Sequence, residues 1–92
     1  MIESKIILLT NQTFEEQGGE KVFPNLSIGK ILVAEGEGTT ETLANFYARL
    51  NLMNKALKEE YTHVFSVEYS PFKTESRKFN CQASGVGYKL RE

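Results

Sequence analysis

The sequence lacks several residue types on which common functional sites depend. It contains no Asp, which excludes a Ser–His–Asp catalytic set. Its single Cys excludes a disulfide framework within the chain. Eleven basic residues nearly balance twelve acidic ones, and no basic patch of the kind used by nucleic-acid-binding modules stands out. These absences argue against a nucleic-acid partner and favour a protein without catalytic residues.

Long apolar runs are absent too. No stretch approaches the ~20 apolar residues of a membrane span, and residues 6–9 are too short for the apolar region of a signal peptide. A chain of 92 residues has room for one modest core. We therefore expect a single cytoplasmic domain, residues 1–92, with no membrane partner.

Residues 39–61 carry the strongest pattern in the chain, because apolar residues recur there at steps of three and four. This stripe consists of Leu43, Phe46, Tyr47, Leu50, Met53, Ala56, Leu57 and Tyr61. The pattern predicts a helix whose stripe packs on a sheet, with Thr39 or Thr40 as N-cap. Leu52 falls on the polar side, where we interpret it as a lone exposed Leu or as a contact with another chain.

Four other stretches have the composition of β-strands. They are residues 5–10, 28–34, 63–69 and 79–90, and we expect Gly36–Gly38 and Ser70–Pro71 to end the second and third. The order β-β-α-β-β predicts an α+β fold. In it, one long helix packs on one face of an antiparallel or mixed four-stranded sheet.

The last strand changes phase near Gly85, since the apolar residues before and after it occupy alternate positions. We favour a β-bulge at Gly85, and the alternative is that the two sets face opposite sides of the sheet. Matching the apolar faces of the last two strands predicts an antiparallel hairpin with Val67 opposite Ala83 and Tyr69 opposite Cys81.

His63 and Cys81 are the only His and Cys, and they are therefore the candidates for a metal or nucleophilic site. In the predicted hairpin they lie about 20 Å apart, too far for one ion. The turn at residues 36–40 resembles a phosphate-binding loop in position, but its three flanking Glu residues would repel an anion. We therefore predict no catalytic residue, no metal site and no cofactor; cofactor-binding residues are unknown.

The first two strands are apolar on both faces, and such strands need cover on both. We expect the helix to cover one face only. The other face would be covered by residues 14–26 folding back or by another subunit, and we favour the subunit. The candidate contacts for self-association are Leu52, Ile7, Leu9, Ile31 and Val33.

Residues 30–90 combine a strand, one Ala-containing helix, the strand HVFSVEY and a closing strand ending ASGVGYKL. This layout resembles the YbjQ-like family of small heavy-metal-binding domains and, more distantly, the dodecins. The resemblance implies an α+β layout and closed homo-oligomers, and we transfer no binding residue from it. We predict a non-catalytic homo-oligomeric binding or assembly domain. The alternatives are a metal- or flavin-sequestering protein and a small enzyme with an intersubunit site.

Overall fold

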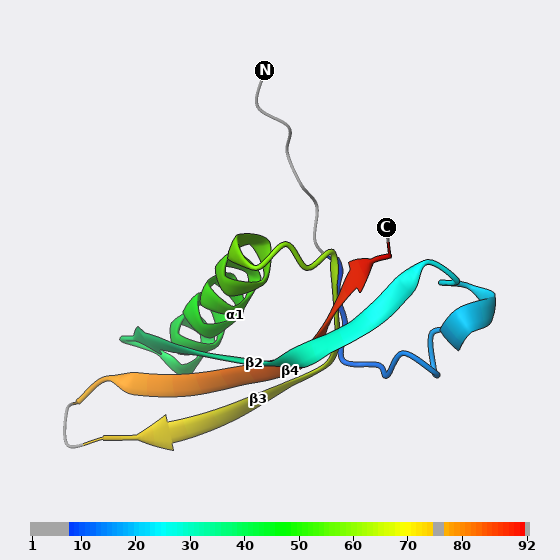
Figure 1. Cartoon of the computed structure of the whole chain (residues 1–92). Coiled ribbons are helices and arrows are strands. Elements are labelled where there is room, and N and C mark those ends of the chain that lie inside the picture. The colour runs from blue at the N-terminus through cyan, green and yellow to red at the C-terminus, as the bar shows by residue number, and fades with distance from the viewer. Residues whose placement is uncertain (1–7, 75–76, 92) are drawn as a thin grey trace.

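The computed structural model describes residues 8–74 and 77–91 (Figure 1). Its elements are β1 (Leu8–Leu9), a 3-10 turn η1 (Gly19–Lys21), β2 (Leu26–Gly38), α1 (Glu41–Lys58), β3 (His63–Lys73) and β4 (Phe79–Leu90). The strands form one mixed sheet in the order β1-β3-β4-β2, and α1 packs on one face of it. The predicted α+β class and the order β-β-α-β-β are confirmed.

β4 lies inside the sheet and pairs antiparallel with both β2 and β3, whereas β1 pairs parallel with β3. Because β4 offers partners along its whole length, β2 continues to Gly38 and β3 continues through Pro71 to Lys73. The predicted strand ends at residues 36–38 and 70–71 were therefore wrong. Residues 5–7 of the first predicted strand lie outside the described residues.

The helix begins and ends close to the predicted limits, with Thr40 as N-cap accepting a hydrogen bond from the Leu43 backbone N–H at 3.1 Å. The predicted buried face is correct for the end of the stripe, where Ala56 is buried and Met53 and Leu57 pack on the core, and wrong for its first half. The residues that it buries against the sheet are Ala44, Ala48, Leu52 and Ala56. Small residues are needed there because α1 lies very close to β2: a Cβ on Gly36 would stand 2.1 Å from the Ala48 nitrogen.

The hairpin of β3 and β4 is antiparallel as predicted, but its register differs from the predicted one by two residues from Glu68 to Lys73 and by one residue from His63 to Phe65. Tyr69 lies opposite Ala83, and Pro71 lies opposite Cys81. The register changes by one residue at an irregularity between Phe65 and Glu68, where Ser66 adopts a positive φ of 58°. Matching apolar faces could not reveal the two-residue difference after it, because a shift of two residues leaves the side chains of that part on the same face.

The favoured bulge at Gly85 is absent, because β4 pairs with β2 without interruption from Val86, opposite Ile31, to Phe79, opposite Gly38. The one irregularity of this pairing lies in β2, between Ile28 and Ile31. The alternative is correct: the two apolar sets of β4 face opposite sides. Cys81 and Ala83 belong to the core under α1. Val86 and Tyr88 belong to a second core on the far face.

This second core is covered by the segment that precedes β2, so residues 14–26 do fold back over the far face. Phe14 stacks on Tyr88 with ring centroids 4.8 Å apart and meets Phe65 edge-on at 5.5 Å. Phe23 also packs edge-on against Phe65 at 5.5 Å. In Figure 1 this segment runs on the side of the sheet away from α1. The cover is partial, since Ile31 of β2 is still 69% exposed.

Candidate functional site

His63 and Cys81 do not meet. Cys81 lies opposite Pro71, eight residues along β3 from His63, which corresponds to roughly 26 Å. His63 Nδ1 lies 2.8 Å from the Thr62 hydroxyl, and its ring packs against Phe23 and Phe65. Burial lowers the pKa of His63. His63 is thus part of the wall of the second core.

Cys81 is buried in the core under α1. Burial raises the pKa of its thiol, which disfavours the thiolate needed for nucleophilic or metal chemistry. Within residues 8–74 and 77–91, no three His, Cys, Asp or Glu side chains are grouped so that they could hold a metal ion. The chemistry of Cys81 is therefore that of a small apolar residue.

The turn between β2 and α1 is shaped by packing. A Cβ on Gly38 would approach the Leu43 Cβ to 2.6 Å, and Gly36 lies under Ala48 as described above. The predicted N-cap is confirmed, with Thr40 satisfying one of the free N–H groups of the first helical turn.

The structure places the predicted contact residues in different environments. Leu52 has no exposed surface, so the interpretation that placed it on the polar side was wrong. Leu9 is half-buried and packs against the core under α1. Ile31 and Val33 are exposed on β2, on the face away from α1. Ile7 lies outside the described residues.

The large apolar residues of the first half of α1 point away from the sheet. We call Leu43, Phe46, Tyr47 and Leu50 the outer face of α1; each is 38–54% exposed. Phe46 and Tyr47 contact each other edge-on with centroids 5.5 Å apart. These residues follow the heptad-like spacing of a helix that packs on another helix. The sequence showed this stripe, but its partner is not the sheet of the same chain.

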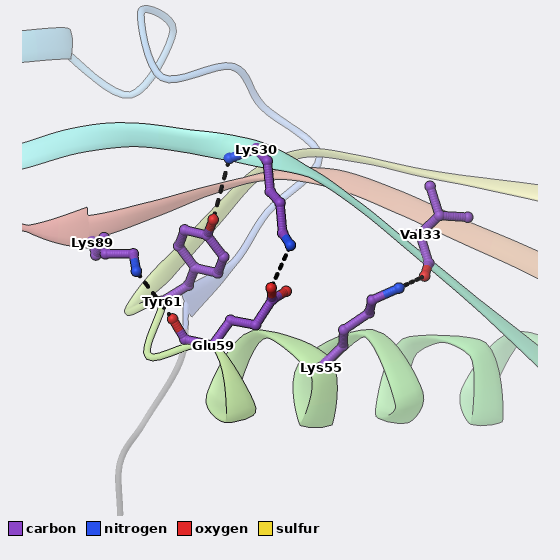
Figure 2. Close-up of polar contacts among 6 residues, drawn as sticks. All are labelled: Lys30, Val33, Lys55, Glu59, Tyr61 and Lys89. Atoms are coloured by element: carbon purple, nitrogen blue, oxygen red, sulfur yellow. Dashed lines mark hydrogen bonds and ion pairs between the residues drawn. The ribbon is translucent and has the colours of Figure 1, made fainter.

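Side chains of α1 also reach the backbone of β2. Asn51 donates from Nδ2 to the Glu35 carbonyl oxygen at 2.7 Å. Lys55 Nζ donates to the Val33 carbonyl oxygen at 2.9 Å (Figure 2). Carbonyls two residues apart point to the same side of a strand. Because β2 ends the sheet, these contacts occupy backbone acceptors on a strand that would otherwise offer them to another chain.

A second polar cluster holds the end of α1 on the sheet. Tyr61 accepts a hydrogen bond at its hydroxyl from the Lys30 backbone N–H at 3.3 Å, and Lys30 forms an ion pair with Glu59 (Figure 2). Lys89 Nζ donates to the Glu59 carbonyl oxygen at 3.2 Å and lies 4.8 Å from the centre of the Tyr61 ring. Every member contacts another member or the backbone, so the cluster has a structural role.

A groove runs between α1 and β3 because α1 lies over β2 and β4 and leaves β3 partly uncovered. We call it the α1–β3 groove; it has a volume of about 490 Å³ and is lined by Leu9, Thr10, Asn11, Arg49, Val67, Glu68 and Tyr69. Burial raises the pKa of Tyr69, and the nearby Arg49 guanidinium opposes this rise. Sequence reasoning missed the groove, because its walls come from three separate parts of the chain.

Across the described residues, no helix has the length and apolar character needed to cross a membrane. In comparisons with known proteins, no family model matches the chain and no curated protein is similar to it.

Proposed function

We propose that the protein is a non-catalytic, cytoplasmic assembly domain that forms homo-oligomers through the outer face of α1. The observation that supports this proposal is the difference in residue size between the two sides of the helix. Ala44, Ala48 and Ala56 face the sheet, while Phe46, Tyr47 and their two Leu neighbours are left half-exposed. Large apolar side chains gathered on one exposed surface mark an interaction site more often than chance.

The area of the outer face fits weak self-association. At roughly 200 Å² for a large residue, the exposed fractions leave about 350 Å² of largely apolar surface on each outer face. Two copies would together bury about 700 Å², which is near half of a standard protein interface and below the roughly 1,000 Å² of a stable one. Because association costs about 4–15 kcal/mol, buried area does not convert directly into affinity. We therefore expect a weak dimer whose population rises with protein concentration.

The sheet edges are poorer places for another copy to bind. On β2, Asn51 and Lys55 already occupy the carbonyls of Glu35 and Val33. On the other side of the sheet, β3 carries Pro71, which has no N–H to donate. This feature discourages the addition of a strand. The outer face of α1 has no comparable protection.

Two further features agree with a second copy as the occupant. The net charge of −1 gives little repulsion between identical chains. Closed homo-oligomers with a two-fold axis are the commonest assemblies of soluble proteins. The resemblance to the YbjQ-like and dodecin families implies the same tendency, although the surface that we propose is the helix rather than the sheet face expected from the sequence.

Sedimentation velocity over a range from low to high micromolar concentration tests the proposal. We expect a mass that is a multiple of 10.4 kDa at high concentration. Phe46→Glu should shift the protein toward the monomer, because a charge would be buried in the contact. Ile31→Glu is the matched control: it adds the same charge at a similarly exposed apolar residue on the far face of the sheet.

The outcomes separate the surfaces. Loss of association in Phe46→Glu with retention in Ile31→Glu supports the outer face of α1. The reverse pattern would move the contact to the far face of the sheet, where the sequence placed it. A monomer of 10.4 kDa at every concentration would show that the chain does not assemble by itself.

A further inference from the structure

The α1–β3 groove has the dimensions and lining of a small-molecule site. Its volume of about 490 Å³ lies within the roughly 300–1,000 Å³ range of ligand pockets. Leu9 and Val67 provide apolar floor, and Tyr69 adds an aromatic ring with a polar end. Both Leu9 and Tyr69 are only half-buried, so part of this apolar surface faces the groove. The walls come from β1, α1 and β3, which the sheet and helix hold in place.

The charge in the groove is positive. Arg49 is its cationic lining residue, and within the described part of the chain its guanidinium forms no ion pair. Glu68 also lines the groove, but it lies between Val67 and Tyr69, which both pack on the core under α1. Alternation along the strand therefore directs the Glu68 carboxylate to the other face.

Negative charge at the other end of the same helix face is distant. Glu41 precedes Arg49 by two helical turns, about 12 Å along the axis. It lines two neighbouring hollows beside Asn45, and Arg49 lines one of them as well as the groove. Thr10 and Asn11 also line the groove and offer a hydroxyl and an amide. Arg49 is therefore the lining residue that favours an anion.

We propose that the α1–β3 groove binds a small aromatic carboxylate. The carboxylate accepts hydrogen bonds from Arg49, whose planar guanidinium matches that group. The flat apolar part of the ligand lies on Tyr69, Val67 and Leu9. This inference does not depend on the proposed assembly. The groove lies on the β3 side of α1, and its lining includes no residue of the outer face.

Titration of the isotopically labelled full chain with 2-naphthoate, followed by amide chemical shifts, tests the site. We expect saturable shifts centred on Leu9, Thr10, Val67 and Tyr69. The neutral counterpart 2-naphthamide has the same ring system without the negative charge. It should bind about tenfold more weakly, the size of one lost charge-assisted hydrogen bond.

Three variants sharpen the test. Arg49→Gln should weaken 2-naphthoate binding about tenfold and leave 2-naphthamide binding nearly unchanged. Arg49→Lys keeps the charge and should recover part of the affinity. Lys58→Gln removes one positive charge from an exposed site at the other end of α1 and should leave both affinities unchanged.

Several results would overturn the inference. Equal affinity for the charged and neutral probes would show that Arg49 does not select the ligand. Shifts centred on Leu43, Phe46 and Leu50 would show that the probe merely coats the outer face of α1. An equal loss of affinity in Arg49→Gln and Lys58→Gln would assign the effect to net charge. Unsaturable shifts would show that the groove is not a site.

Discussion

Leu52 and Leu50 provide a direct test of how α1 sits on the sheet, because they are the same residue type two positions apart on opposite sides of the helix. Leu52 has no exposed surface, whereas Leu50 is 38% exposed. Leu52→Ala leaves a cavity in the core and should reduce the free energy of unfolding by about 3 kcal/mol, within the usual range of roughly 2.7–5.0. Leu50→Ala should reduce it by about 1 kcal/mol.

Urea denaturation at low protein concentration measures both changes. The loss at Leu52 is large for a chain of this length, whose whole stability is about 5–14 kcal/mol. With a slope of about 1.5 kcal/mol per molar urea, the midpoint should fall by roughly 2 M. Leu52→Met keeps the volume and should lose less than about 1.5 kcal/mol. If Leu50→Ala proves as destabilising as Leu52→Ala in dilute solution, the assignment of the helix faces is wrong.

Three further substitutions have defined outcomes. Gly36→Ala places a Cβ against the Ala48 nitrogen, so it should lower the free energy of unfolding by about 2–3 kcal/mol in the same urea assay; an unchanged midpoint would mean that α1 lies farther from β2. Tyr61→Phe leaves the Lys30 N–H without its acceptor and should lower the free energy of unfolding by about 1 kcal/mol. Slower amide exchange at Lys30 in this variant would contradict the prediction. Burial lowers the pKa of His63 in the folded state, so stability should be lost as the pH falls below the unfolded value of about 6.5. His63→Phe keeps a ring and should remove this part of the pH dependence, and an identical pH profile would refute it.

The elements could be predicted from the sequence because each has its own local signal. The helix limits followed from the apolar period and from Thr40, and the strand HVFSVEY followed from alternation. The face of the helix could not be predicted in this way. Periodicity locates the largest apolar residues, whereas the contact with β2 at Gly36 selects small ones, so Ala44 and Ala48 face the sheet.

The register and the groove depend on information that no single segment contains. The change of register within the hairpin lies at Ser66, which adopts a positive φ and has no sequence signal for that conformation. The α1–β3 groove exists because α1 lies over β2 and β4, so that Arg49 comes to lie beside Tyr69 and Leu9. The phase change near Gly85 could be seen in the sequence. Choosing between a bulge and two opposite apolar faces required knowing that residues 14–26 cover the far face.

The aromatic cluster on the far face has a consequence for how the molecule opens. Phe14 and Phe23 lie in a segment that is joined to the sheet by few backbone hydrogen bonds, among them Gln12 with Ser66 at 2.8 Å and Asn25 with Arg91 at 2.6 Å. This segment contributes no buried residue to the core under α1. It can therefore detach while that core stays folded, as a separate unit of lower local stability.

In this respect residues 11–25 behave as an intramolecular ligand of their own sheet. The fraction of time for which Phe65 and Tyr88 are exposed to solvent then depends on the effective concentration of Phe14 and Phe23. That concentration depends on the length of the tether after β1 as well as on the ring contacts. Inserting flexible residues after Asn11 would lower that concentration gradually without altering any contact. Native-state hydrogen exchange should then report faster exchange at Ser66 while the amides of α1 keep their protection.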